Sequence, residues 1–176
     1  MPDSIWDSTL TQFRDRLAGA ESVPAGVSTA AVSAAFALSL LEKVLRIASK
    51  RKDFSGDREL AESLIAQAHK QALDLSLLAD RDVIAYRTRS REMIAVPIDV
   101  ARAAVQGLAL CEQAKHLVHA LVAPDLETAA ALLTAAAKSA LLTVDFNLQQ
   151  LPEDHPYRAE ATVELTPLWQ RFRADR

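Results

Sequence analysis

The chain has few glycine and proline residues, which folds with many turns need. Its 176 residues include four glycines and seven prolines, and aromatic residues make up 5%. Those glycines and prolines fall near the ends of expected elements, which argues against a β-sandwich or barrel with its many turns. One cysteine, Cys111, cannot form an intramolecular disulfide bond and suits a reducing cytoplasm. With half of the residues hydrophobic, the core must be built mainly from Ala, Leu and Val.

The chain also carries nearly equal numbers of positive and negative residues. Lysine and arginine total 20 and aspartate and glutamate 23, which gives a net charge of −3. Proteins that bind nucleic acid normally carry a basic surplus on one face, so we expect no nucleic-acid partner. The first residues contain Asp3 and Asp7 and no basic segment of the kind that opens a signal peptide. The sequence therefore predicts a cytoplasmic protein.

One long uncharged stretch, residues 22–41, has about the length of a membrane-spanning helix. It contains Pro24, Gly26 and several serines, and most of its other residues are alanine. Such a segment is too weakly apolar to partition well into lipid. We expect a buried core helix that its neighbours approach closely, and no contact with a membrane.

Apolar residues at helical spacing predict an all-α fold in a single domain, residues 1–176. We expect helices at about residues 4–18, 28–52, 58–89, 97–122, 125–151 and 157–176. Asp57 is placed to cap the third helix and Pro97 to open the fourth. Leu10, Leu60 and Val163 belong to the expected buried stripes. Five to six helices of this kind predict an up-and-down bundle with an Ala-rich core.

Asp82 lies in the middle of an apolar stripe. Leu78 and Tyr86 are four residues away on either side, and Ala79 and Ala85 are three residues away. Burying an unpaired carboxylate is costly, so Asp82 needs a partner or a purpose. Two interpretations stay open: an ion pair with an arginine of a neighbouring helix, or a carboxyl group that moves or orients a proton.

Five short motifs follow one another in a recognisable order. They are PAGVS at residues 24–28 before an Ala-rich stretch, KRKDF at 50–54, DVIAY at 82–86, VPI at 96–98, and PDLETA at 124–129 followed by Asn147. In this order and spacing they resemble the cyclodeaminase domain of formiminotransferase-cyclodeaminase and the bacterial methenyltetrahydrofolate cyclohydrolases. The resemblance covers about residues 5–151.

The resemblance implies a homodimer that acts on a tetrahydrofolate derivative and needs no other cofactor. It implies Asp125 as the first catalytic candidate and Asp82 as the second, because the chemistry needs a carboxylate near a delocalised cation. We expect no formiminotransferase domain fused to the chain, which favours the cyclohydrolase reaction. An ordinary N-cap is the alternative for Asp125.

The remaining site candidates are expected to bind the substrate. Gly26 and Ser28 could offer amide donors at a helix N-terminus, or simply cap that helix. Arg51 and Lys52 could hold the anionic glutamate tail of folate, or complement a helix dipole in solvent. Asn147 could contact the edge of the pterin, or tie adjacent helices together.

Departures from the family pattern leave a second function open. Ala25 and Val27 replace loop glycines, Pro124 replaces a serine and Thr143 an asparagine, and the connection before Val96 is short. A non-catalytic homologue that serves as a binding or assembly module is one alternative, and an enzyme for a different pterin-like ligand is another. His116 and His119 have no second pair of ligands, so we expect no metal.

Overall fold

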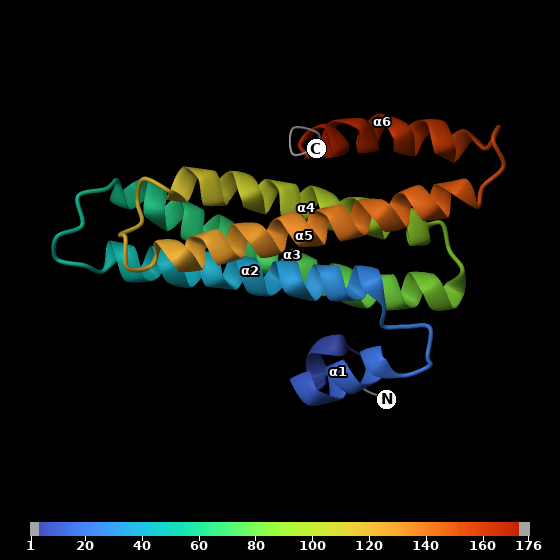
Figure 1. Cartoon of the computed structure of the whole chain (residues 1–176), viewed down its shortest axis with the longest axis horizontal. Helices are drawn as coiled ribbons and strands as arrows, with labels where there is room; N and C mark the ends of the chain where they lie inside the picture. The colour runs from blue at the N-terminus through green and yellow to red at the C-terminus, as the bar shows by residue number, and fades with distance from the viewer. Residues whose placement is uncertain (1–3, 173–176) are drawn as a thin grey trace.

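The computed structural model describes residues 4–172, and every regular element within that range is a helix. Its elements are a short 3-10 helix η1 (Ile5–Asp7), α1 (Leu10–Ala18), α2 (Gly26–Ser49), α3 (Arg58–Thr88), α4 (Glu92–Ala114), α5 (Ala123–Gln149) and α6 (Pro156–Gln170). Figure 1 shows α2 to α5 running up and down beside one another. The predicted up-and-down all-α bundle is confirmed.

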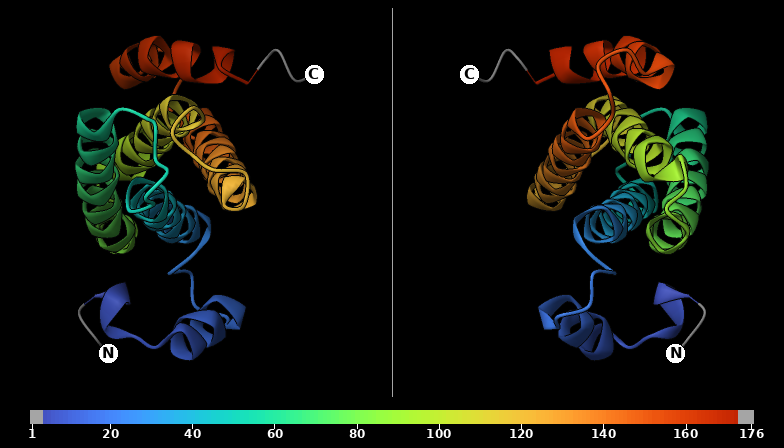
Figure 2. Two further views of the ribbon diagram at one scale, coloured as in Figure 1. Left: turned by 90° about the vertical axis from the view of Figure 1, so that its left-hand side faces the viewer. Right: turned by 90° about the vertical axis from the view of Figure 1, so that its right-hand side faces the viewer.

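Each of the four long helices has two main neighbours: α2 packs against α3 and α5, and α4 also packs against α3 and α5. The two end-on views in Figure 2 place α1 and α6 outside this four-helix body, on opposite sides of it. The core is built from small side chains, as predicted: Ala31, Ala34 and Ala37 of α2 are fully buried. Small residues let helix backbones approach closely, and the larger Leu38 and Leu41 fill the space between them.

The uncharged stretch expected in the core forms the first two thirds of α2, and it is buried as predicted. By length and composition alone, two other helices could cross a membrane. In α4, 61% of the apolar window is buried inside the bundle, and in α5 39%. The helix α4 is therefore a core helix, whereas α5 exposes a long apolar face.

The first helix is shorter than predicted. A capping box breaks the expected helix 4–18: the Thr9 side chain accepts from Gln12 N, and the Gln12 side chain accepts from Thr9 N. This reciprocal pair starts a new helix at Leu10. Asp57 caps α3 as predicted, accepting from Leu60 N at 3.0 Å.

Some residues that were expected to be buried are exposed. Leu10 of α1 is 69% exposed and Val163 of α6 75%, because these outer helices cover less of the body than their patterns suggest. Leu60 is 36% exposed in the first turn of α3. The last predicted helix ends at Gln170, and residues 173–176 lie outside the described range.

The start of α4 differs from the prediction. The helix begins at Glu92, so Pro97 lies inside it and not in its first turn. A proline has no N–H, which leaves the carbonyl of the residue four positions earlier, Met93, without its usual donor. Asn147 of α5 supplies one, because its Nδ2 donates to Met93 O at 2.7 Å. This tertiary bond explains how the helix continues through a proline.

The ends of the predicted fourth and fifth helices also change. The helix α4 stops at Ala114, and the chain to Val122 forms turns, including a bond from Val122 N to His119 O. The helix α5 begins at Ala123 with Pro124 in its first turn, which suits a residue that lacks an N–H. Asp125 lies in that first turn and is not the N-cap residue, so the capping alternative was wrong.

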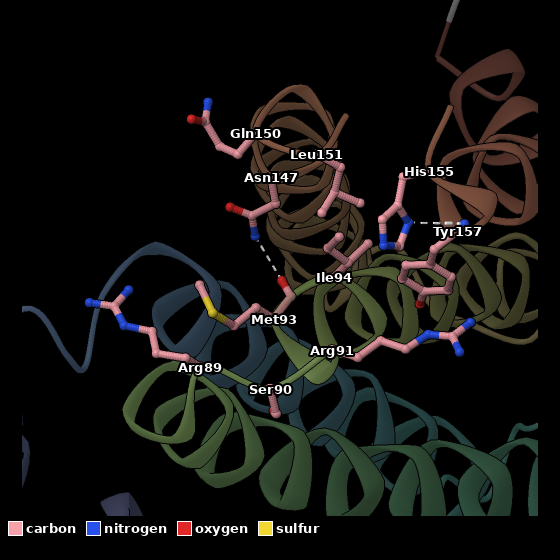
Figure 3. Close-up of a pocket in the computed structure, with 10 residues that line it drawn as sticks. All are labelled: Arg89, Ser90, Arg91, Met93, Ile94, Asn147, Gln150, Leu151, His155 and Tyr157. Carbon is pink, nitrogen blue, oxygen red and sulfur yellow. Dashed lines mark hydrogen bonds between the residues drawn. The ribbon is translucent and has the colours of Figure 1, made fainter. Parts of the chain in front are cut away.

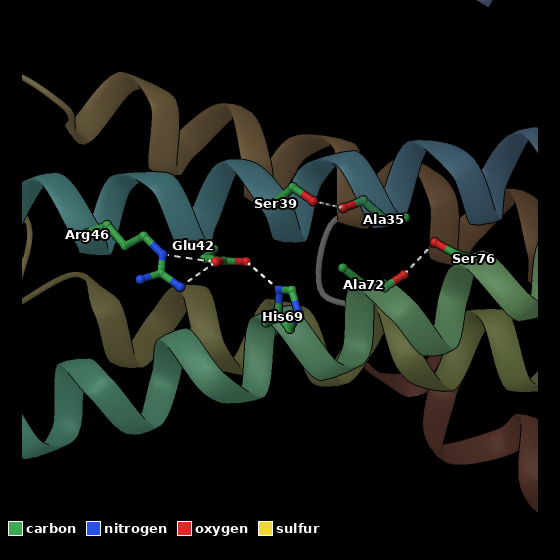
Figure 4. Close-up of polar contacts among 7 residues, drawn as sticks. All are labelled: Ala35, Ser39, Glu42, Arg46, His69, Ala72 and Ser76. Atoms are coloured by element: carbon green, nitrogen blue, oxygen red, sulfur yellow. Dashed lines mark hydrogen bonds and ion pairs between the residues drawn. The ribbon is translucent and has the colours of Figure 1, made fainter. Parts of the chain in front are cut away.

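A polar cluster ties α2 to α3 on the outside of the body (Figure 4). Glu42 Oε1 accepts from Arg46 Nε and Nη2 at 2.9 and 2.8 Å, and its Oε2 lies 3.2 Å from His69 Nδ1. Burial raises the pKa of Glu42, but the hydrogen bonds from Arg46 and His69 outweigh that effect and hold the pKa below its usual value. Glu42 therefore stays ionised at neutral pH, and its hydrogen bonds link the two helices.

Candidate functional site

At the end of the bundle where α2 begins, Asp82 of α3 holds the first turn of α2. Its Oδ2 accepts from Ser28 N at 3.0 Å and from Ser28 Oγ at 2.5 Å. The N-cap residue of α2, Ala25, makes no side-chain cap. A carboxylate from another helix thus satisfies an amide at a helix N-terminus, where negative charge is favoured. The partner of Asp82 is Ser28, so the arginine pairing considered from the sequence was wrong.

The environment of Asp82 favours a carboxyl group that exchanges protons. Burial raises its pKa, and the hydrogen bonds from the Ser28 hydroxyl and amide offset this only in part. Ser28 itself is fully buried. A carboxyl with a raised pKa, fixed in orientation and facing a pocket, has the properties of a general acid or base.

A pocket of about 210 Å³ opens beside this pair. It is lined by residues from four parts of the fold, among them Ser22, Gly26, Asp82, Tyr86, Met93 and Asn147. Three predicted site residues, Asp82, Gly26 and Asn147, line one pocket, and Ser28 holds Asp82 beside it. A Cβ added at Gly26 would meet nothing within 4 Å, which shows open space above the start of α2.

Tyr86, Ser22 and Met93 line the pocket although the sequence did not single them out as site residues. Tyr86 follows Asp82 by one helical turn, a spacing that puts both on one face of α3. Hydrogen bonds from Ser22 and then Arg89 lower the pKa of Tyr86. The spacing could have identified Tyr86, whereas nothing local in the sequence links Met93 to residues 54 positions later.

Asn147 of α5 ties adjacent helices together, as one of its two interpretations predicted; its contact with a pterin stays a prediction. Its Nδ2 holds Met93 O of α4, and Figure 3 shows the amide oxygen turned away from that bond. The oxygen remains available as an acceptor for a ligand N–H. Asn147 thus ties α5 to α4 and also lines the pocket.

A model of the formiminotransferase-cyclodeaminase family matches residues 9–91 and 85–166. The chain belongs to the formiminotransferase-cyclodeaminase family. A solved structure of formiminotetrahydrofolate cyclodeaminase from Thermotoga maritima is similar, with a TM-score of 0.86 and 22% identity over 97% of this chain and 92% of that chain. No curated protein matches the chain.

The family membership inferred from the five motifs is confirmed, and the structural likeness shows a shared cyclodeaminase fold. The fold also shows that the motifs divide into two groups. PAGVS and DVIAY meet at the end of the bundle that contains Asp82, and VPI lies in the second turn of α4, which begins at that end. KRKDF and PDLETA lie at the other end, where α2 finishes and α5 begins (Figure 1).

The second group places Arg51, Lys52 and Asp125 far from Asp82 within one chain. The helix α2 alone has 24 residues, which separate its two ends by about 36 Å at 1.5 Å per residue. Arg51 is paired with Asp53 through two hydrogen bonds of 2.9 and 2.8 Å, and Asp125 is exposed in the first turn of α5. One chain therefore does not bring all the predicted residues into a single site.

A second pocket at that end, of about 170 Å³, is lined by Arg51, Asp53, His116 and His119 among others. Within residues 4–172, no group of three or more His, Cys, Asp or Glu side chains is arranged to hold a metal ion. Cys111 of α4 is buried in the core, and burial raises the pKa of its thiol to about 12.

Proposed function

We propose that this protein catalyses a one-carbon reaction of tetrahydrofolate, the hydrolysis of its methenyl bridge. Membership of the formiminotransferase-cyclodeaminase family supports a folate substrate. The observation that carries the proposal is Asp82, a half-buried carboxyl group with a raised pKa, fixed by Ser28 at a pocket. Cyclodeamination of a formimino group uses the same carbon and the same kind of proton transfer, and is the second candidate.

In the proposed reaction, water adds to the cationic carbon between N5 and N10, and Asp82 takes one proton from that water. The carboxylate also stabilises the delocalised cation before water adds. Asp82 then returns its proton to N5 as the carbon–N5 bond breaks, and the added hydroxyl loses its proton to solvent as the formyl group forms. Positioned acid–base catalysis of this kind contributes about 10²- to 10⁴-fold to the rate.

The neighbouring residues take positioning roles. Ser28 orients Asp82 through its amide and hydroxyl, which leaves the second carboxylate oxygen, Oδ1, to face the substrate. Asn147 accepts from an N–H on the edge of the pterin. Gly26 leaves room for the ring to approach the first turn of α2.

We also propose a homodimer, with the exposed apolar face of α2 and α5 as its interface. Phe36 is 45% exposed, Leu142 62% and Phe146 61%, and large exposed apolar surfaces mark contact sites. Phe146 also lines the Asp82 pocket, so the interface borders the site. A twofold axis across the bundle would run paired helices antiparallel.

Such a dimer would bring the two groups of predicted residues together. Asp125, Arg51 and Lys52 of one subunit would then lie near Asp82 of its partner, because opposite ends of the two bundles meet. Asp125 would add a second carboxylate to the site, and Arg51 and Lys52 would add positive charge. This arrangement reconciles the motifs with their separation in one chain.

The test is the loss of methenyltetrahydrofolate absorbance with purified protein, against buffer alone. We expect acceleration by the wild type and a loss of about 100-fold or more in Asp82→Asn. Ammonia release from formiminotetrahydrofolate, measured in parallel, identifies the second candidate reaction. No acceleration of either reaction by a protein with an intact helical circular dichroism spectrum would refute the proposal and favour the non-catalytic homologue.

Mixing two inactive variants tests the dimeric site. Random pairing of Asp82→Asn with Asp125→Ala makes half of the dimers mixed, each with one intact site, so about a quarter of the wild-type activity should return. Full activity of Asp125→Ala alone would show that Asp125 takes no part. Light scattering on wild type and Leu142→Glu reports the dimer and its interface.

A further inference from the structure

A larger pocket adjoins the pocket at Asp82. Met93 and Asn147 line both pockets, so the two are neighbours, and together they are here called the depression. The larger pocket has a volume of about 400 Å³. Figure 3 shows that it lies where the loop after α3, the first turn of α4, the end of α5 and the start of α6 converge. Together the two are of a size that binds small organic ligands.

Charge and polarity change along this depression. Asp82 supplies negative charge at one end. Ile94 and Leu151 make the middle of the larger pocket apolar, and Arg91 and His155 lie at its far end. Arg89 lines the larger pocket too, and its guanidinium lies 4.4 Å from the centre of the Tyr86 ring, which lines the smaller one. The depression therefore fits an elongated ligand with a hydrogen-bond-donating head, an apolar middle and an anionic tail.

Arg91 is held ready for a carboxylate. Its guanidinium lies 3.8 Å from the centre of the Tyr157 ring, and its Nη2 is 2.6 Å from Glu160 Oε2. Stacking on a ring fixes the plane of the guanidinium, and one ion pair leaves further N–H donors of its five. Its side chain is 68% exposed, so a ligand can reach it.

His155 presents a donor on the same side. Its Nδ1 accepts from Tyr157 N at 3.2 Å as the N-cap of α6, so Nε2 carries the proton of the neutral ring. Nε2 can donate to a carboxylate. Both Tyr157 and His155 belong to the start of α6, the helix that lies outside the four-helix body (Figure 2).

We propose that this larger pocket binds the glutamate tail of the folate substrate, with its carboxylates on Arg91 and His155. The inference rests on the proposed function, since it takes a reduced folate as the ligand in the Asp82 pocket. It replaces Arg51 and Lys52 of the same chain, which lie at the other end of the bundle, as the residues that recognise the tail. Glu160 competes with the tail for Arg91 and so limits its affinity.

The experiment measures the binding of two stable reduced folates by titration calorimetry. One is 5-formyltetrahydrofolate with a single glutamate, and the other is the neutral amide of 5-formyltetrahydropteroate (the pteroate), which lacks the glutamate and carries no carboxylate. The ratio of their affinities isolates the tail. We compare wild type with Arg91→Gln, Glu160→Gln and, as a matched control, Arg102→Gln. Arg102 also joins α4 to α6, through Glu164, but does not line the pocket.

We expect Arg91→Gln to weaken the glutamate-bearing ligand about tenfold, since a charge-assisted hydrogen bond is lost, and to leave the pteroate unchanged. Glu160→Gln should strengthen the glutamate-bearing ligand, and Arg102→Gln should change neither. An affinity ratio that Arg91→Gln leaves at the wild-type value would overturn the tail site while the proposed function stands. Failure of the wild type to bind either ligand would overturn both.

Discussion

The contact between Asn147 and Met93 makes a prediction that links the proline in α4 to the stability of the fold. Pro97 is fully buried and cannot donate, so Met93 O depends on Asn147 Nδ2 at 2.7 Å. Asn147→Leu removes that donor at nearly constant size. In Pro97→Ala, by contrast, residue 97 regains an N–H that can bond to Met93 O within the helix. The cost of losing Asn147 should therefore depend on residue 97.

The loss of stability expected from Asn147→Leu depends on whether Met93 O still has a hydrogen-bond donor. In the wild-type background, Asn147→Leu loses a partly buried hydrogen bond and leaves Met93 O without a protein donor, which costs about 1.5 kcal/mol. In the Pro97→Ala background the same change should cost under about 0.5 kcal/mol, so the coupling free energy is about 1 kcal/mol. For a chain of this length, 1 kcal/mol shifts the melting temperature by about 2–4 °C.

Urea denaturation of the wild type, the two single variants and the double variant, followed by circular dichroism, measures that coupling. Pro167→Ala is the matched control, because Pro167 also lies inside a helix, α6, and does not contact Asn147 in the described hydrogen bonds. Its coupling to Asn147→Leu should be close to zero. Equal costs of Asn147→Leu in the wild-type and Pro97→Ala backgrounds would refute the reasoning.

Three further predictions concern single residues. Burial raises the pKa of Asp82 above its usual 3.8, so the stability that Asp82 contributes is fully present below pH 3.8 and is lost as pH rises through the raised pKa. The urea midpoint of Asp82→Asn, relative to that of the wild type, should therefore increase as pH rises over that range. A difference between the two midpoints that does not change with pH would contradict this. A Cβ at Gly107 would lie 3.0 Å from side-chain atoms of Leu133 and Leu38, so Gly107→Val should lose about 1–3 kcal/mol by the same assay, with Gly107→Ala as the smaller control. Because the Cys111 thiol has a pKa of about 12, a thiol reagent should label unfolded but not native protein, and rapid native labelling would show that the core opens.

Helical periodicity and end signals predicted most of the fold, since they are local. The capping residue Asp57 and the basic stretch after α2 marked helix ends to within a few residues. The start of α4 was missed because Pro97 favours a helix N-terminus locally, and the bond that lets the helix pass through it comes from Asn147 on another helix. A tertiary donor of this kind leaves no signal near the proline.

One part of the candidate site, Asp82, was predictable because a charged residue at a buried position is unusual. Asp82 stood out because a carboxylate in an apolar stripe demands a partner, and the structure supplies Ser28 and a pocket. Its partner was not predictable, since the amide of residue 28 becomes a donor only where the start of α2 meets α3. Asp125, Arg51 and Lys52 were grouped with Asp82 by the order of motifs, and order along a chain does not report distance across a bundle.

This arrangement also bears on the loop glycines that the chain lacks. Asp82 is held by the amide of residue 28, which any residue other than proline provides, and by the hydroxyl of Ser28. Ala25 and Val27 contribute no side-chain hydrogen bond to it, while Gly26 keeps the space above the first turn of α2 open. Replacement of the two flanking glycines therefore leaves both the carboxyl group and the approach to it intact. The departure that would matter is one at Ser28, because its hydroxyl opposes the effect of burial on the pKa of Asp82 and its loss would leave a partly buried carboxylate with one donor fewer.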